Sequence, residues 1–272
     1  MFTIGHIVWL IIGIIVVPLS IYLIKKNNIS LKQVLFVAGI IAIISEIVKF
    51  YSCMTMLEKV TAVYTSSGIS YVGTGEYVPF LEYKDFPLEL CSIQIFLIWI
   101  AYFMKDSDNK TTLLGFMFPT MILGGIVACL LPGPLQDYTT FGLDTFISAR
   151  MIQFFLYHFM IIIVGFSIAR SNEVHFDKKN CMQTIILMSL YCATTLYLNS
   201  LLSVAVYEDQ QAIGIISLTN LLTTYLNPLG IAVTTKVGWL INIIIDLALG
   251  VIGVLLVYYP VLRRNKKQQS NK

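Results

Sequence analysis

The chain has 272 residues, of which 57% are hydrophobic and only 12% are charged, and its formal net charge is +3 at pH 7. Soluble domains carry about 25% charged residues, so this composition excludes a water-soluble globular protein, a disordered chain and a disulfide-stapled secreted scaffold. It predicts an all-α polytopic membrane protein. The basic residues lie in short connections and in the tail, so nothing indicates binding to nucleic acid.

Seven apolar segments are long enough to cross a bilayer as helices, which takes about 20 mainly apolar residues. They predict a single seven-helix transmembrane domain over residues 1–262, followed by a disordered basic cytoplasmic tail over residues 263–272. No basic residue precedes the first segment, so we expect a retained anchor there and no cleaved signal peptide. In chain order the predicted spans are residues 4–24, 32–55, 87–104, 111–131, 147–169, 181–206 and 237–261.

The basic residues predict the orientation of these helices. Cytoplasmic loops carry an excess of Lys and Arg, and with the N-terminus outside and the C-terminus inside, thirteen basic residues lie inside and only three lie in outside loops. The Ile-, Lys- and Asn-rich composition indicates a bacterial plasma membrane as the location. The inside set is Lys25, Lys26, Lys32, Lys105, Lys110, Arg170, Lys178, Lys179, Arg263, Arg264, Lys266, Lys267 and Lys272.

Two of the predicted outside loops are long. The first, residues 56–86, is polar and contains several glycines. The second, residues 207–236, contains an apolar stretch over 212–226 that is too short to span easily and ends at the turn signal Asn227-Pro228. We expect a re-entrant or interfacial helix in this stretch.

Strongly polar side chains within the predicted spans gather at one depth. Charged groups in hydrocarbon are costly and usually mark a function. A rise of about 1.5 Å per residue puts these side chains in the outer halves of five helices, which predicts one shared polar cavity. The candidate substrate-binding residues are Glu46, Lys49, Gln94, Arg150, Gln153, Asn199, Asn242 and Asp246.

A packing role is the alternative for the same side chains. Glu46 and Lys49 are three residues apart and share a helix face, so they can form an ion pair that only fixes helix packing. Asp246 can pair with Arg150 for the same purpose. The amide side chains can form interhelical hydrogen bonds, which contribute about 0.6 kcal/mol each.

Cys91 and His158 are the candidate catalytic residues. Cys91 lies in the first turn of the predicted third helix, where free amides and the helix dipole stabilise a thiolate, although Glu89 nearby disfavours a second negative charge. A nucleophilic cysteine needs a base, and His158 is the intramembrane histidine. Alternatively, Cys91 forms a disulfide with Cys53 or Cys129, or these thiols and His158 only pack.

The spacing of ligand-type residues indicates neither a metal site nor a cofactor. The five cysteines form no Cys-x-x-Cys pair, and the three histidines are scattered along the chain. No glycine-rich phosphate-binding loop is visible.

Two motifs resemble those of the YwaF-type integral membrane family, whose animal relatives are the transmembrane protein 164 acyltransferases. Phe-Pro-Leu-Glu-Leu-Cys at residues 86–91 is similar to the family's Pro-Leu-His-Leu-Cys, and Phe-Phe-Leu-Tyr-His at residues 154–158 is similar to its Phe-Phe-Leu-x-His. The resemblance covers roughly residues 1–205. Glu89 departs from it, because the family commonly has histidine at that place.

This resemblance implies acyl transfer with membrane lipids as substrates. Cys91 would carry the acyl group as a thioester, His158 would be the general base, and Glu46, Arg150 and Asn199 would line the cavity. We therefore expect a membrane-embedded lipid acyltransferase or lipid-remodelling enzyme.

Two other functions fit the same composition. One is a transporter or binding module for a small polar solute, with Glu46, Lys49, Arg150 and Asp246 as its binding charges. The chain has no visible two-fold repeat, which counts against a transporter. The other is a structural subunit of a membrane complex, in which these polar residues affect stability alone.

Overall fold

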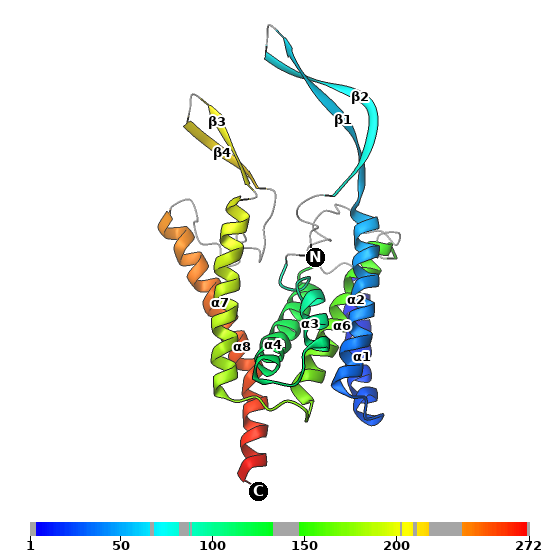
Figure 1. Cartoon of the computed structure of the whole chain (residues 1–272), viewed down its shortest axis with the longest axis vertical. Coiled ribbons are helices and arrows are strands. Elements are labelled where there is room, and N and C mark those ends of the chain that lie inside the picture. The colour runs from blue at the N-terminus through cyan, green and yellow to red at the C-terminus, as the bar shows by residue number, and fades with distance from the viewer. Residues whose placement is uncertain are drawn as a thin grey trace.

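The computed structural model describes residues 4–65, 68–81, 87, 89–132, 147–201, 203–208, 211–217 and 236–270. They form a helical bundle with two β-hairpins projecting from one end (Figure 1). The helices are α1 (Ile4–Lys26), α2 (Leu31–Cys53), α3 (Gln94–Phe103), α4 (Asp108–Leu130), α6 (Ala149–Arg170), α7 (Lys178–Leu201) and α8 (Lys236–Ser270). The strands are β1 (Thr55–Thr65), β2 (Gly68–Phe80), β3 (Ser203–Glu208) and β4 (Gln211–Ser217).

Six helices in the described part of the chain are long and apolar enough to cross a membrane, judged by length and composition. The remaining helix, α3, has only ten residues. At a rise of about 1.5 Å per residue, its length is about half the roughly 30 Å thickness of the hydrocarbon core. The mainly helical, multi-pass membrane class is confirmed. The count of seven spans and the outside position of the N-terminus stay predictions.

Serine is the N-cap residue of three of the long helices. Ser30, Ser107 and Ser148 each accept a hydrogen bond from the backbone N–H three residues later, before α2, α4 and α6 respectively. A cap of this kind satisfies one of the free amides that every helix N-terminus leaves. Gln33 completes a capping box with Ser30 by accepting from the Ser30 backbone N–H at 3.0 Å. These local signals set where the helices start.

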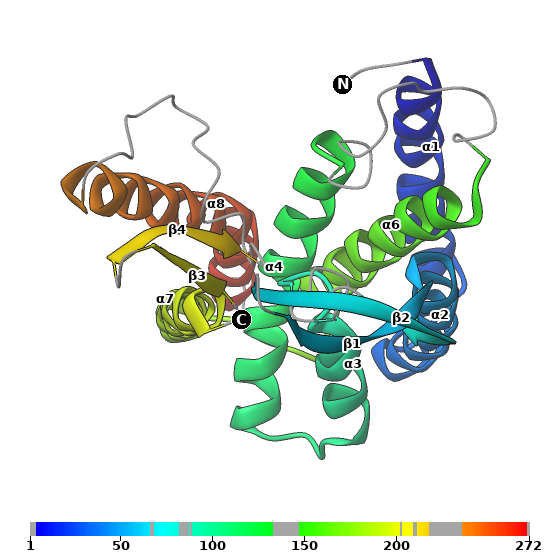
Figure 2. The ribbon, with the colours of Figure 1, turned by 90° about the horizontal axis from the view of Figure 1, so that it is seen from above.

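Helices α4 and α6 form the centre of the bundle. Helix α6 packs against α1, α2 and α4, while α4 also contacts α3, α7 and α8. Viewed from above, α7 and α8 lie on the opposite side of α4 from α1 and α2 (Figure 2). Fully buried side chains of both helices, such as Met117, Met121 and Ile161, belong to the hydrophobic core.

Apolar side chains also cover the outer faces of the bundle. Ile14 on α1 and Leu256 on α8 expose 73% and 69% of their surfaces. In water such faces would be unstable, but lipid tails solvate them without cost. The pattern is the one expected of helices that face hydrocarbon.

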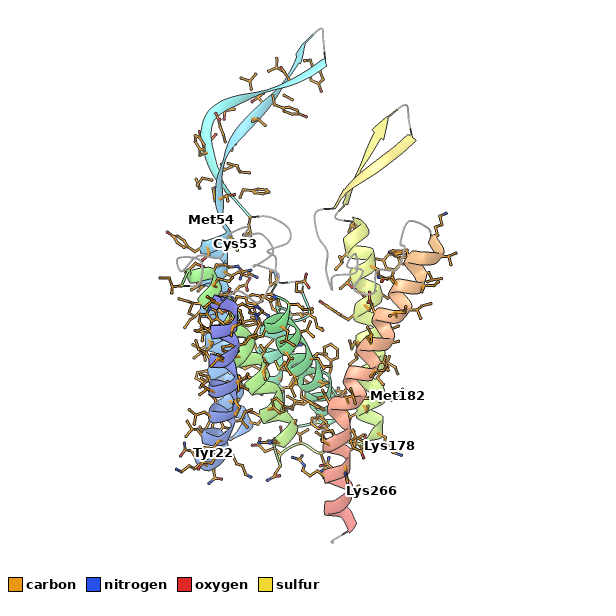
Figure 3. The ribbon with its side chains drawn as sticks, turned by 180° about the vertical axis from the view of Figure 1, so that it is seen from behind. Tyr22, Cys53, Met54, Lys178, Met182 and Lys266 are labelled. Carbon is orange, nitrogen blue, oxygen red and sulfur yellow. The ribbon has the colours of Figure 1, made fainter. Side chains whose placement is uncertain are left out.

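The connections rich in basic residues lie at one end of the bundle. The α1–α2, α3–α4 and α6–α7 connections and the C-terminal end lie together at the end opposite the hairpins (Figure 1). Lys178 and Lys266 lie at this end, while Cys53 and Met54 lie at the hairpin end (Figure 3). The connections that the sequence predicts to be cytoplasmic are therefore brought to one end.

The first predicted loop contains an antiparallel hairpin. β1 and β2 pair from Thr55 opposite Phe80 to Thr65 opposite Gly68. The side chain of Glu58 accepts a hydrogen bond of 2.7 Å from the backbone of Gly75, which has a φ of +76° that glycine adopts without strain. The predicted loop therefore has regular structure of its own.

The second predicted loop also contains a hairpin, which corrects two expectations. Helix α7 ends at Leu201, and residues 203–206, predicted as helix, belong to β3. Residues 212–217, predicted as part of a re-entrant or interfacial helix, belong to β4, while 218–226 lie outside the described residues. β3 contains two valines and β4 contains three isoleucines, and β-branched side chains favour extended backbone.

The last helix is longer than predicted. α8 continues to Ser270, so residues 263–270 are helical in place of the predicted disordered tail. Within this extension, the buried side-chain amide of Asn265 donates a hydrogen bond of 2.8 Å to the carbonyl oxygen of Phe176. This bond ties the end of α8 to the α6–α7 connection.

Candidate functional site

Cys91 lies in a run of hydrogen-bonded turns that leads into α3. The helix begins at Gln94, so the prediction that places Cys91 in the first helical turn is wrong by three residues. The carbonyl oxygen of Cys91 accepts a hydrogen bond of 3.2 Å from the backbone of Gln94. The thiol is partly buried against the core of α2, α3, α4 and α6.

Tyr157 holds the backbone of Cys91 against α6. Its hydroxyl donates a hydrogen bond of 2.7 Å to the Cys91 carbonyl oxygen. Tyr157 is only 5% exposed, and its ring centroid lies 5.5 Å from that of His158. The residue before the candidate base therefore positions the candidate nucleophile. The sequence reasoning missed this tyrosine, although a phenol in the middle of a predicted span needs a hydrogen-bond partner.

Two adjacent glycines of α4 lie beneath Cys91 and His158. A Cβ placed on Gly124 would be 3.0 Å from the Cys91 sulfur. A Cβ placed on Gly125 would be 3.1 Å from the carbonyl oxygen of His158 and 2.5 Å from the side chain of Ile162. The absence of side chains on this Gly-Gly pair lets the turn before α3 and the middle of α6 approach α4 closely. The pair of small residues within a predicted span was the missed signal.

The imidazole of His158 is buried and oriented by its own helix. Its Nδ1 lies 2.6 Å from the carbonyl oxygen of Phe154, and the side chain is 7% exposed. Since a carbonyl oxygen only accepts, Nδ1 carries a proton and donates, and in the neutral imidazole the lone pair is then on Nε2. This is the tautomer that a general base needs. In the described part of the chain, no hydrogen bond joins the imidazole to the Cys91 thiol.

Gln94 carries a buried oxygen that lacks a hydrogen-bond partner among the described residues. Its side-chain NH2 group donates to Thr120 at 3.0 Å and to the carbonyl oxygen of Leu90 at 3.3 Å. Its Oε1 atom receives nothing, although the residue is 0% exposed. A buried unsatisfied acceptor costs about 1–3 kcal/mol. This oxygen is an acceptor that no described residue satisfies.

A second polar cluster lies between α2 and α6. Gln153 donates a hydrogen bond of 2.7 Å to the hydroxyl of Ser45 and accepts one from the guanidinium of Arg150. On α2, Lys49 and Glu46 form an ion pair of 2.6 Å, and Lys49 is 7% exposed. The ion pair expected under the packing alternative is therefore present.

The two candidates on α8, Asn242 and Asp246, form a hydrogen bond with each other. Asp246 accepts a hydrogen bond of 3.2 Å from Asn242 one turn earlier on α8, a helix that packs against α7 and α4. Asp246 forms no ion pair with Arg150, so that alternative is wrong for these two described residues. For Asn199 the side chain lies outside the described residues.

The described residues form neither a disulfide nor a metal-binding cluster. No disulfide joins any two of the five cysteines, all of which are described, so the disulfide alternative is wrong. Across the residues that the structure describes, no three His, Cys, Asp or Glu side chains are arranged to hold a metal ion. His6 lies on α1, where its ring nitrogen is 2.8 Å from the carbonyl oxygen of Cys129.

The chain matches the TMEM164 family over residues 1–258, which covers both motifs and every candidate residue of the site. The chain belongs to the TMEM164 family. This match confirms the relationship that the two motifs indicate, and with the apolar helices it makes the protein a multi-pass membrane protein of that family. No curated protein and no solved structure matches the chain.

Proposed function

We propose that this TMEM164-family member is a membrane-embedded lipid acyltransferase or lipid-remodelling enzyme, with Cys91 as nucleophile and His158 as general base. The observation that carries the proposal is the hydrogen bond from Tyr157 to the carbonyl oxygen of Cys91. It attaches the cysteine to α6 one residue away from a histidine whose Nδ1 donates to the Phe154 carbonyl oxygen, so that the neutral ring has its lone pair on Nε2. A nucleophilic thiol and a neutral imidazole on neighbouring elements are the parts that such chemistry requires.

The first half-reaction forms an acyl-enzyme. Nε2 of His158 accepts the Cys91 proton, and the sulfur attacks the carbonyl carbon of a phospholipid acyl ester. The carbon–sulfur bond forms, the ester carbon–oxygen bond breaks, and the departing lysophospholipid oxygen takes the proton back from the imidazolium. The products are a thioester on Cys91 and a lysophospholipid, and no electrons are exchanged with another molecule.

The second half-reaction releases the acyl group to an acceptor lipid. The acceptor hydroxyl transfers its proton to His158 and attacks the thioester carbon, so that an ester bond forms and the Cys91 sulfur leaves and is reprotonated. The unpartnered Oε1 of Gln94, three residues from the nucleophile, offers an acceptor for that hydroxyl. The same group that removes a proton in one step returns it in the next.

Backbone amides beside Cys91 supply the donors for the negative oxygen of each tetrahedral intermediate. In the described structure neither Cys91 nor Ser92 uses its backbone N–H in a hydrogen bond. Two fixed amides at the nucleophile stabilise charge as it develops, and losing one such donor typically costs about 100- to 1,000-fold in kcat. The Gln94 amide is already engaged with Thr120, and the Arg150 guanidinium with Gln153, so the backbone is the better source.

The test is acyl exchange in proteoliposomes. The purified full chain is incubated with a phospholipid carrying a labelled acyl chain and an unlabelled lysophospholipid, and transfer is followed by mass spectrometry. We expect Cys91→Ala and His158→Ala to lower transfer by about 1,000-fold or more, the scale on which catalytic groups act. Cys192→Ala and His175→Ala are the matched controls and should retain it.

Two results would overturn the proposal. Full transfer by Cys91→Ala would exclude the thioester. If Cys91→Ser were tolerated while Glu46→Gln abolished uptake of a polar solute, the solute-binding alternative would replace acyl transfer. A thioester trapped on Cys91 and absent from His158→Ala would support the division of roles.

A further inference from the structure

A cavity of about 750 Å³ is lined by residues of the helix ends and connections opposite the hairpins. The end of α1, the start of α2, the end of α6 with the connection that follows it, and the last turns of α8 all contribute to its lining. It is separate from the candidate site, because Cys91 lies beside Gly124, near the other end of α4. Ligand-binding cavities commonly have volumes of about 300–1,000 Å³.

Three basic side chains from three helices line this cavity. They are Lys25 of α1, Arg170 of α6 and Arg264 of α8. In the described part of the chain none of them forms an ion pair, since the ion pairs there join Lys49 to Glu46, Lys59 to Glu76 and Lys110 to Asp106. Like charges brought together without a partner repel one another, and an anion between them removes that repulsion.

Glu173 is the single acidic residue in the described lining, and its carboxylate is already in use. Its Oε1 accepts a hydrogen bond of 3.1 Å from the backbone N–H of Leu31, the first residue of α2. The carboxylate therefore serves the N-terminus of a helix, where negative charge is favoured. With three cations and one carboxylate, the lining keeps a formal charge of +2.

The remaining lining divides into a polar part and an apolar part. Ser30, Ser171 and Asn172 add hydroxyl and amide groups, whereas Ile21, Ile24 and Val34 add apolar surface. An inorganic phosphate ion would use only the charged part of such a volume. A phospholipid headgroup uses both, because its phosphate meets the cations while its glycerol and first methylenes meet the isoleucines.

We propose that this cavity binds the phosphate-bearing headgroup of an anionic phospholipid in the leaflet at this end of the bundle. Two arginines favour phosphate, because the guanidinium presents a planar set of donors that matches phosphate oxygens. Basic pockets between transmembrane helices are a recognised way of binding anionic headgroups. The site is independent of the acyl-transfer proposal, since it involves neither Cys91 nor His158.

The experiment measures binding of dioctanoyl phosphatidylglycerol to the purified full chain in detergent micelles. The test variant is Lys25→Gln/Arg170→Gln/Arg264→Gln. The matched control is Lys26→Gln/Lys179→Gln/Arg263→Gln, which removes the same charge from neighbouring positions that do not line the cavity. We expect the test variant to weaken binding by about tenfold or more and the control to change it by less than about twofold.

A variant that should bind more tightly tests whether misfolding could explain the loss of binding in the test variant. Glu173→Gln keeps an oxygen that can accept from Leu31 but removes the one negative charge of the lining. We expect it to bind dioctanoyl phosphatidylglycerol about two- to fivefold more tightly at low salt, an effect that salt weakens. A partly unfolded protein would not bind more tightly, so this result separates charge from stability.

Competing ligands identify the source of the phosphate. Zwitterionic dioctanoyl phosphatidylcholine should bind about tenfold more weakly than dioctanoyl phosphatidylglycerol, because it carries no net negative charge for the basic cavity. Equal binding of inorganic phosphate, with the same sensitivity to the test variant, would show a free-phosphate site and overturn the lipid assignment. Equal losses of affinity in the test and control variants would show that binding depends on surface charge in general, and would overturn the proposed site.

Discussion

The hydroxyl of Tyr157 donates a hydrogen bond of 2.7 Å to the carbonyl oxygen of Cys91, across 66 positions of sequence. The bond fixes the turn before α3 to the centre of α6. The two catalytic candidates therefore depend on one phenol for their relative placement, although the thiol and the imidazole share no hydrogen bond in the described structure.

Tyr157→Phe should therefore loosen Cys91 without unfolding the protein. The variant loses one buried hydrogen bond, which typically contributes about 0.5–1.5 kcal/mol. We expect faster alkylation of Cys91 by a maleimide and slower acyl transfer, measured in a variant with no other cysteine. Tyr197→Phe, at a position 80% exposed, is the control and should leave both rates unchanged. An unchanged Cys91 alkylation rate in Tyr157→Phe would contradict the positioning role.

The two glycines of α4 should respond differently to alanine. At Gly125 the new Cβ would meet the backbone oxygen of His158 and the Cγ1 atom of Ile162, neither of which can move easily. At Gly124 it would meet only the Cys91 sulfur, at 3.0 Å. We expect Gly125→Ala to lower the free energy of unfolding by about 1–3 kcal/mol, and Gly124→Ala to slow alkylation of Cys91 while keeping the fold.

Gly250 provides the control for these substitutions. A Cβ added there would lie 2.6 Å from the terminal methyl of Met188, and a methionine side chain moves aside readily. Thermal unfolding in detergent should show a much smaller loss for Gly250→Ala than for Gly125→Ala. Equal losses at the two positions would mean that α4 and α6 are not held as closely as described.

Removing Glu46 from its ion pair with Lys49 should destabilise the protein mainly because the buried Lys49 then has no counter-charge. Lys49 is 9% exposed at its side chain and Glu46 is 29% exposed. Breaking a fully buried pair costs about 3–5 kcal/mol, and the partial exposure of Glu46 reduces our expectation for Glu46→Gln to about 1–3 kcal/mol. In a double-mutant cycle, Glu46→Gln/Lys49→Met should recover part of that loss. Additive losses would show that the two side chains do not interact.

Tyr258 should be important for attaching α8 to the bundle. Its hydroxyl donates a hydrogen bond of 2.8 Å to the carbonyl oxygen of Gly115 on α4 and lies 3.0 Å from the hydroxyl of Thr184 on α7, and the residue is 0% exposed. Tyr258→Phe leaves a buried acceptor, so we expect a loss of about 1–3 kcal/mol in thermal unfolding. Tyr259→Phe, at a position 63% exposed, should be neutral. Equal stability of the two variants would contradict this role for the bond.

The sequence predicts the helical spans far better than the connections between them. Long apolar runs identify a membrane helix directly, because backbone in hydrocarbon must satisfy its own hydrogen bonds. The hairpins were missed because strand pairing joins residues on two separate segments, as in Thr55 opposite Phe80. A two-stranded hairpin leaves only a weak local pattern, and the stretch over 212–217 fits an apolar helix equally well.

Composition and local pattern by themselves determined the membrane class, the basic connections, and the two motifs that carry Cys91 and His158. They did so because hydrophobicity, charge and short motifs are properties of neighbouring residues. Only the tertiary structure decided that Tyr157 bonds to Cys91, that Asp246 does not pair with Arg150, and that three helices share one basic cavity. Those facts depend on how helices distant in sequence are rotated and aligned against one another, which close packing sets through many contacts together.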